Sequence, residues 1–455
     1  MAVHEPLDEK RYSVVGKSVQ KIDGIGHVTA ATRYVDDLQF ANLQHTALIR
    51  SPYRHARILS IDTSAAERLP GVSAVVTYRD VANNIHGLLQ GAGVQPDEPL
   101  LAELEVCFVG QPIAAVAAES LEIAREAARL VSVEYEELPA VMEALESMKP
   151  GAPPVRTAHD VYPNHYIYAG HPFRRVRYGD YESAIQRADH IVQGSYSIAP
   201  IEHAPIETQV SVSVPDASGK LVVYSTTQAM YFTMGNLASL LGIPLSKVKF
   251  IGGTVGGGFG GKVDGATEPI TALLALKSGL PVKWRFTREE ENLYSSTRSG
   301  VYIDITDGVL NNGRVIARKV RTVQDTGAYN RTGPYGTNKN ANHAQGPYDI
   351  PNVWIDGWCV YTNRQPASAM RGFGVFEATF PLEVQMEKIA RTIGMDPWEL
   401  RFRNVYRRGS MTAAREPLHT VAIIETMKAA AEAAGIELTA EQRAMTSDSP
   451  LEAIS

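Results

Sequence analysis

A glycine-rich run, VGGGFGGK at residues 255–262, constrains this 455-residue chain more than any other feature of its sequence. Five of the six residues between Val255 and Lys262 are glycine, so the backbone there can make turns and close approaches that side chains would block. The run directly follows VKFIGGT, which predicts a strand. We therefore expect a loop that lies against something flat or anionic, with Phe259 as its one large side chain.

One interpretation of this loop is a phosphate-binding P-loop. Gly256, Gly261 and Lys262 satisfy most of the pattern G-x-x-x-x-G-K. A P-loop needs Ser or Thr after its lysine, because that hydroxyl holds magnesium, and here the residue is Val263. Phe259 also interrupts the backbone amides that would wrap the phosphates. Both departures argue against a P-loop.

Two further interpretations start from the same glycines. Gly256, Gly258 and Gly261 satisfy the dinucleotide fingerprint G-x-G-x-x-G, and a helix is predicted over 268–279. That fold also needs an acidic residue at the end of the next strand, about 20 residues on. In GLPVKWRFTREEE the acids come several residues past the strand core. A tight turn that binds nothing is the other alternative.

Composition limits the class of protein. The net charge is −6 and the Lys and Arg residues are scattered, which argues against a nucleic-acid partner. The N-terminus lacks the apolar core of a signal peptide, and no run approaches the about 18 apolar residues of a membrane span. We expect a cytoplasmic protein. Cys107 and Cys359 are too few for an iron–sulfur site or a zinc site built on cysteine, so two buried, reduced thiols are expected.

The order of predicted elements indicates an α/β (α+β) chain in two parts. Residues 1–147 contain a strand at 112–118, a helix capped by Ser120 and a returning strand. Residues 148–160, which begin with MKPGAPPV, are the expected linker, because Pro and Gly interrupt all periodicity. The second part, 161–455, contains a helix predicted over 380–393 that ends at Gly394.

Several motifs, in order, resemble one family. VGGGFGGK together with AMRGFG at 369–374 resembles the two signature loops of the xanthine oxidase family of molybdenum hydroxylases. The family carries a glutamine after a Thr-rich strand, where this chain has Thr226-Thr227-Gln228. Residues 346–363, GPYDIPNVWIDGWCVYTN, resemble the strand before the second loop. Residues 34–62 are similar to the start of the family's α/β-hammerhead domain, so the resemblance implies that domain followed by the first part of a molybdopterin-binding domain.

The resemblance implies roles for individual residues. Phe259 and Gly260 would lie beside molybdenum and its pterin, and the amides of the loop, with Gly257 and Gly258, would bind the cofactor. Gln228 would donate a hydrogen bond to an oxo ligand of the metal. Arg371 would present its backbone amide to the oxygens on the metal, with its side chain buried in a supporting network.

Three residues would shape the substrate pocket. Phe373 would be an aromatic wall. The purine-oxidising branch has Glu where this chain has Val263, and Arg where it has Lys339, nine residues before Tyr348. Losing that Glu removes a hydrogen-bonding partner for a purine, which makes xanthine a poor candidate substrate. Lys339 keeps a positive charge for a carboxylate; its alternative is a solvated loop lysine.

The resemblance also implies partners. The Gly-x-Gly-Glu segment that carries the family's catalytic base is not in this sequence. We expect it on a second molybdopterin-domain subunit, as in the nicotinate dehydrogenase type, although a truncated chain would explain the same observation. The cofactor would be molybdopterin with molybdenum, as the cytosine dinucleotide, and 2Fe–2S clusters and FAD would lie on an iron–sulfur and a flavin subunit. The expected reaction hydroxylates an electron-poor carbon of an N-heteroaromatic small molecule; the alternatives are reductive or hydration chemistry on another ring, or a non-catalytic structural subunit.

Overall fold

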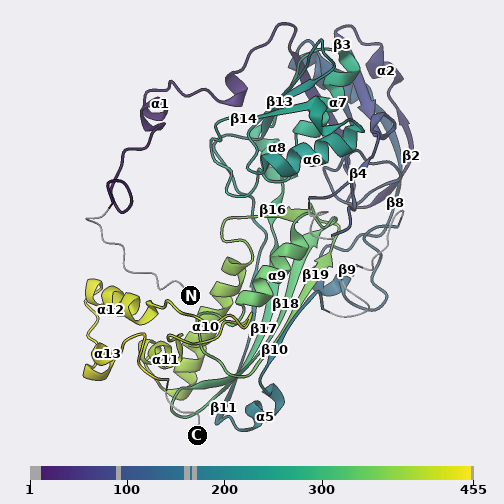
Figure 1. Cartoon of the computed structure of the whole chain (residues 1–455). Coiled ribbons are helices and arrows are strands. Elements are labelled where there is room, and N and C mark those ends of the chain that lie inside the picture. Colours follow the sequence, from purple (N-terminus) through teal and green to yellow (C-terminus); the bar gives the residue numbers. More distant parts are fainter. Residues whose placement is uncertain (1–11, 89–93, 158–163, 167–171, 452–455) are drawn as a thin grey trace.

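The computed structural model describes residues 12–88, 94–157, 164–166 and 172–451 (Figure 1). Its strands form a seven-stranded and a six-stranded sheet with helices on both, which agrees with the predicted mixed α/β class. Figure 1 shows the larger sheet at the top, with α6 (Met230–Leu241) and α7 (Glu268–Ser278), and the smaller sheet below it. Each sheet has its own core of buried apolar side chains.

The seven-stranded sheet takes strands from both sides of the predicted linker. Gln44 and His45 pair in parallel with Val282 and Lys283, so the N-terminal strands continue the sheet that precedes the glycine loop. Helix α7 is buried on this sheet from Glu268 to Ala275, which explains its nearly uniform apolar sequence. In spatial order the strands are β14 (Val248–Gly252), β13 (Leu221–Ser225), β12 (Val210–Pro215), β15 (Val282–Arg285), β1 (Gln44–Arg50), β7 (Pro112–Ala118) and β3 (Val72–Thr77).

Local signals place the N-terminal elements where the sequence predicts them. Strand β7 covers the predicted 112–118, and α3 (Leu121–Leu130) begins after Ser120, whose hydroxyl accepts the N–H of Ile123 at 3.2 Å. The returning strand β8 (Ser132–Glu137) joins β2 (Ala56–Asp62) and β6 (Glu105–Val106) in a three-stranded sheet. The other short elements are α1 (Gly24–Val28), α2 (Ser64–Glu67), α4 (Ala144–Ser147), β4 (Ile85–His86) and β5 (Glu98–Pro99).

The six-stranded sheet carries α9 (Gly333–His343) and α10 (Val375–Ile393). A buried ion pair between Arg318 and Asp307 anchors α10 to it, because Gln385 of α10 donates to Asp307 at 3.0 Å. Its strands are β10 (Arg174–Tyr178), β19 (Val353–Tyr361), β18 (Val315–Gly327), β17 (Gly300–Val309) and β11 (His190–Ile198), with β9 (His165–Tyr166) beside β19. Helix α5 (Tyr181–Gln186) packs on β17 and β18, and the pair β16 (Thr297–Arg298) and β20 (Ala367–Ser368) adjoins β18. Helix α8 (Arg288–Tyr294) lies in the upper part of Figure 1.

Helix α10 starts earlier than predicted. It begins directly after Gly374 and not near residue 380, so Pro381 lies inside the helix and not in its first turn. The predicted end holds, with Gly394 in the left-handed conformation at φ +69°. Asp396 then caps α11 (Pro397–Asn404) by accepting the N–H of Glu399 at 3.0 Å. Two more helices follow, α12 (Ile423–Ala433) and α13 (Ala440–Ala444).

Both cysteines are buried thiols, as expected. Burial raises the pKa of Cys359 to about 12, so it stays a neutral thiol. Across the described ranges, no helix combines the length and the apolar character needed to cross a membrane.

Candidate active site

Gln228 holds the glycine-rich loop from the end of β13. Its backbone N–H donates to the carbonyl of Lys262 at 2.8 Å. Its side-chain oxygen accepts the N–H of Gly260 at 2.9 Å and that of Lys262 at 3.3 Å. Both bonds use the same oxygen, and within the described residues the amide Nε2 has no protein partner. Because Gln228 is exposed, this amide is a free donor at the loop surface.

Two glycines of the loop are required by close contacts. A Cβ at Gly258 would lie 2.4 Å from Oε1 of Gln228. Gly260 has φ +103°, and a Cβ there would lie 2.4 Å from the carbonyl oxygen of Ala369 in the second loop. The glycines therefore let the first loop touch both Gln228 and the AMRGFG segment.

Phe259 connects the two loops while its ring stays accessible. It has φ +53°, and 46% of its surface is exposed. Its carbonyl accepts the N–H of Arg371 at 2.8 Å. This differs from the expectation for Arg371, whose amide is engaged by protein and whose side chain is exposed and not buried. The exposure arises because no described segment of this chain covers that face of the loop.

The side chain of Lys262 is buried in an ion pair within the protein, which removes the basis of the P-loop interpretation. Its Nζ lies 2.8 Å from a carboxylate oxygen of Glu207, and its side chain is only 2% exposed. The same oxygen of Glu207 accepts the N–H of Gly256 at 2.8 Å. A carboxylate thus occupies the position where a P-loop lysine would meet phosphate. No local pattern relates Glu207 to a loop about fifty residues away, and sequence reasoning missed it.

The dinucleotide interpretation also lacks its helix. In that fold the glycines open directly into a helix N-terminus, where the amides hold the pyrophosphate. Here β14 ends at Gly252 and α7 begins only at Glu268, with irregular backbone between them. Glu268 is itself buried in the first turn of α7, and burial raises its pKa. The loop is an independent structure and not the start of a helix.

His203 is a second residue that sequence reasoning missed. Its Nε2 lies 2.8 Å from the carbonyl of Ala369, and a carbonyl can only accept, so Nε2 carries the proton. Its Nδ1 is buried and has no hydrogen-bond partner among the described residues; the carboxylate of Glu202 lies 4.0 Å away. A Cβ at Gly261 would lie 2.9 Å from that Nδ1, so the ring packs directly under the glycine loop. His203 therefore braces both loops from beneath.

Phe373 and Lys339, two predicted pocket residues, lie around one tyrosine. The ring of Phe373 lies 5.7 Å from that of Tyr335, and Nζ of Lys339 lies 5.5 Å from the same ring. Gly374 packs against Cβ of Lys339, since an added Cβ would approach it to 2.6 Å. Lys339 lies on α9 and is half-buried, which corrects the alternative of a solvated loop lysine.

Val263, the third predicted pocket residue, is held in place by its two neighbours. Lys262 is fixed by Glu207, and Asp264 accepts the hydroxyl of Ser368 at 2.6 Å. Arg331 also contacts Asp264, at 3.2 Å. Val263 is half-buried between these anchors. Its position is therefore fixed by the contacts of Lys262 and Asp264.

Together these contacts form one continuous surface that fits a bulky anionic group. Gln228 offers a free amide, the glycines let the loop pack closely on Gln228 and the second loop, and Phe259 offers an exposed ring. The carboxylate of Glu207 under the loop is neutralised by Lys262. The free side-chain amide of Gln228 is a donor that suits oxygen and phosphate groups.

Comparisons with known proteins identify the domains of the chain. Residues 158–405 match the family described as the molybdopterin cofactor-binding domain. Residues 29–139 match the a/b hammerhead domain of aldehyde oxidase and xanthine dehydrogenase. The nicotinate dehydrogenase large molybdopterin subunit of Eubacterium barkeri is 34% identical over 93% of this chain and 97% of its own length. A Bacillus subtilis protein, named as a probable xanthine dehydrogenase subunit, is 38% identical over 84% of this chain and 50% of that protein.

A solved structure gives the same picture at the level of the fold. The aldehyde oxidoreductase of Desulfovibrio gigas superposes with a TM-score of 0.85 at 29% identity, over 92% of this chain and 47% of that one. The chain thus spans about half the length of several relatives and nearly all of the Eubacterium barkeri subunit. The fold is a hammerhead domain followed by a molybdopterin-binding domain.

Proposed function

Since the chain belongs to the xanthine oxidase family, we propose that it is the molybdopterin-binding subunit of a molybdenum-dependent hydroxylase whose site is shared with a second chain. When bound, the cofactor supplies the two-electron and oxygen-transfer chemistry. This chain supplies one wall of the site, built from the two signature loops. The proposal includes a cytoplasmic location and the cytosine dinucleotide form of the cofactor.

The free amide of Gln228 is the observation that carries the proposal. Its oxygen is used to fix the loop, so its Nε2 is left in a rigid position to donate to an oxygen ligand. The backbone of Gly257, Gly258 and Gly260 would lie along the cofactor, and the exposed ring of Phe259 would cover one edge of the pterin. The backbone N–H of Arg371 donates to the carbonyl of Phe259 and so helps to orient the phenylalanine ring.

The substrate that fits these residues best is an N-heteroaromatic carboxylate. Lys339 offers a cation with no paired carboxylate within the described residues, and Phe373 offers an aromatic face nearby. Val263 gives no hydrogen bond to a purine, which disfavours xanthine. Nicotinate has both the ring and the carboxylate that these groups would recognise, and the Eubacterium barkeri relative supports this substrate class.

Partner chains complete the proposal. The catalytic base would be a glutamate of the second molybdopterin-domain subunit. Electrons would leave through 2Fe–2S clusters on an iron–sulfur subunit to FAD on a flavin subunit. The chain spans about half of the Bacillus subtilis protein and nearly all of the Eubacterium barkeri large molybdopterin subunit, which supports a site that a second chain completes.

Elemental analysis of the natively purified complex tests the proposal. We expect about one molybdenum and about four irons per copy of this chain, the iron in two 2Fe–2S clusters. Iron without molybdenum, after expression with the cofactor-maturation machinery, would instead indicate a structural subunit. The absence of both metals from a complex with its partners present would refute a molybdenum hydroxylase.

A further inference from the structure

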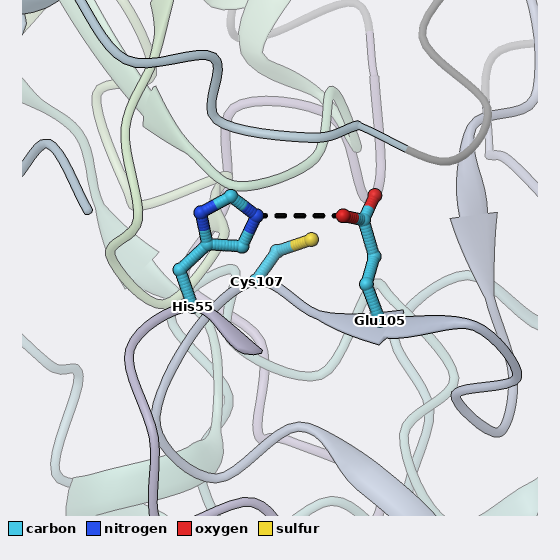
Figure 2. Close-up of side chains that lie close together, drawn as sticks. All are labelled: His55, Glu105 and Cys107. Carbon is cyan, nitrogen blue, oxygen red and sulfur yellow. Dashed lines mark hydrogen bonds and ion pairs between the residues drawn. The ribbon is translucent and has the colours of Figure 1, made fainter. Parts of the chain in front are cut away.

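A buried cluster of His55, Glu105 and Cys107, none of them in a signature loop, lies in the hammerhead domain (Figure 2). His55 directly precedes β2, Glu105 begins β6 and Cys107 follows that strand. The side chains of His55 and Glu105 are 1% and 8% exposed, and Cys107 is fully buried. One nitrogen, one oxygen and one sulfur atom all lie within 4.8 Å of one another. Figure 2 shows the three side chains pointing toward a common centre.

The hydrogen bonds around the cluster orient its lone pairs inward. Nδ1 of His55 lies 2.7 Å from the carbonyl of Pro139, so Nδ1 is the donor. Nε2 of the same ring points at Oε2 of Glu105. Glu105 accepts the N–H of Thr157 at Oε1 (2.8 Å) and Oε2 (3.0 Å), and the Thr157 hydroxyl at Oε2 (2.6 Å). With a neutral imidazole, Nε2 and Oε2 would be two facing lone pairs, an arrangement that a cation between them would stabilise.

The distance between these acceptors is that of a shared metal ion. Nε2 of His55 and Oε2 of Glu105 are 3.4 Å apart. A direct charge-assisted hydrogen bond would bring them to about 2.7–2.9 Å. Tetrahedral zinc with bonds of about 2.0–2.1 Å separates its nitrogen and oxygen ligands by roughly 3.3–3.4 Å. The observed separation therefore matches an edge of a zinc tetrahedron better than it matches an ion pair.

The surroundings provide what a metal site needs beyond its ligands. Metal-bound histidines commonly donate their other ring nitrogen to a carbonyl, as His55 does to Pro139. The ligating carboxylate is held in turn by Thr157. A cavity of about 30 Å³ bordered by Glu105, Arg156 and Tyr329 adjoins the cluster. It has room for one water molecule, which can serve as the fourth ligand.

We propose that His55, Glu105 and Cys107 bind one divalent metal ion of the zinc class in a structural site. A mixed nitrogen, oxygen and sulfur set suits zinc. Because none of the three side chains is exposed, the ion would stabilise the fold and would not meet a substrate. The ion would join the starts of β2 and β6 to the segments around Pro139 and Thr157, which connect the hammerhead domain to the rest of the chain. This site is independent of the molybdenum cofactor.

The test uses the full chain produced without partner subunits, in medium containing zinc, followed by zinc content and zinc K-edge X-ray absorption. We expect about one zinc per chain, with one sulfur neighbour at about 2.3 Å and nitrogen or oxygen neighbours at about 2.0–2.1 Å. Cys107→Ala should lose the sulfur neighbour and lower the zinc content severalfold. Cys359→Ala, which removes the other buried thiol, should change neither.

Two results would overturn the site. One is wild-type protein that holds less than about a tenth of a zinc per chain, or zinc without a sulfur neighbour; the cluster would then be a buried ion pair. The other is Cys107→Ala with unchanged zinc content and sulfur scattering, which would place the metal elsewhere. If Cys107→Ala does not fold, the wild-type spectrum and that of Cys359→Ala still decide between the outcomes.

Discussion

The side-chain oxygen of Gln228 accepts the backbone N–H of Gly260 at 2.9 Å, and this bond leaves the Gln228 amide without a protein partner among the described residues. One residue thus fixes the glycine loop with one atom and offers a donor with the other. Gln228→Glu should separate these roles, because a carboxylate keeps the acceptor and loses the donor. We expect kcat to fall about 10–100-fold, because the variant loses one hydrogen bond to a charged oxygen. The molybdenum content should stay at the wild-type level.

The control for this variant is Gln193→Glu, at an exposed position of β11 far from the loops. It should leave kcat unchanged. Turnover by Gln228→Glu at the wild-type rate would show that the free amide has no role in the reaction.

Gly260→Ala should empty the cofactor site. The new Cβ would meet the Ala369 carbonyl at 2.4 Å in a backbone with φ +103°, so the two signature loops must separate. We expect a severalfold loss of molybdenum per chain, measured by elemental analysis. Gly279→Ala is the matched control, because Gly279 also has positive φ (+72°) but has open space around it. Gly279→Ala should lower the free energy of unfolding by about 1–2 kcal/mol and leave the molybdenum content unchanged. Equal loss of molybdenum in both variants would contradict the steric argument.

Glu207→Gln should destabilise the protein strongly. It leaves the buried ammonium of Lys262 without its charge partner, a change that typically costs about 3–5 kcal/mol in free energy of unfolding. Denaturant unfolding measures this, and adding Lys262→Met should recover part of the loss. Lys149→Met breaks the exposed pair with Glu146 and should shift stability by less than about 0.5 kcal/mol. Similar losses in Glu207→Gln and Lys149→Met would mean that the buried pair contributes little.

Asp325→Asn should change how stability depends on pH. Burial raises the pKa of Asp325 to about 6, so its protonated form favours folding below the ordinary pKa and this contribution is lost as pH rises through about 6. Asn keeps the oxygen that accepts from Gly327 and Thr362. Relative to wild type, the variant should therefore gain stability between pH 4 and pH 7, by up to about 3 kcal/mol.

Urea midpoints measured across this pH range provide the test of Asp325. Asp216, an exposed carboxylate whose pKa is lowered mainly by the hydroxyl of Ser218, gives the control. Asp216→Asn should follow the wild-type curve above pH 5. A constant gap between Asp325→Asn and wild type at all pH values would exclude the titration of Asp325 as the cause.

Lys339→Met should weaken binding of a carboxylated substrate selectively. We expect KM for nicotinate to rise about tenfold, with KM unchanged for its uncharged carboxamide, because only the carboxylate meets the cation. Lys339→Arg should retain part of the affinity, since it keeps the charge and changes the geometry. An equal rise in KM for both compounds would assign Lys339 to the pocket's structure and not to charge recognition.

Short sequence signals predicted the elements whose ends are fixed by adjacent residues. The serine cap of α3 and the glycine that ends α10 are each read from a few adjacent residues. The positions of Gln228 and the two loops also followed from motifs, and the structure brings them into contact. Their roles toward the cofactor and the substrate stay predictions.

Contacts between distant segments could not be predicted in the same way. Glu207 with Lys262, and His203 with Ala369, join residues that no periodicity relates. Helix α9 was missed because GPYGTNKNANH has low intrinsic helix propensity. It is helical because small side chains on its inner face, including Gly336 and Ala341, pack closely against the six-stranded sheet.

The parallel pairing of Gln44 with Val282 has a consequence for synthesis. Strand β1 cannot find this neighbour until about 240 further residues have left the ribosome, which takes roughly 10–50 s at typical translation rates. During that time one edge of the nascent N-terminal sheet stays unpaired and open to other chains. Because β15 is synthesised long after β1, we expect newly synthesised chains to depend on chaperones until β15 has been made.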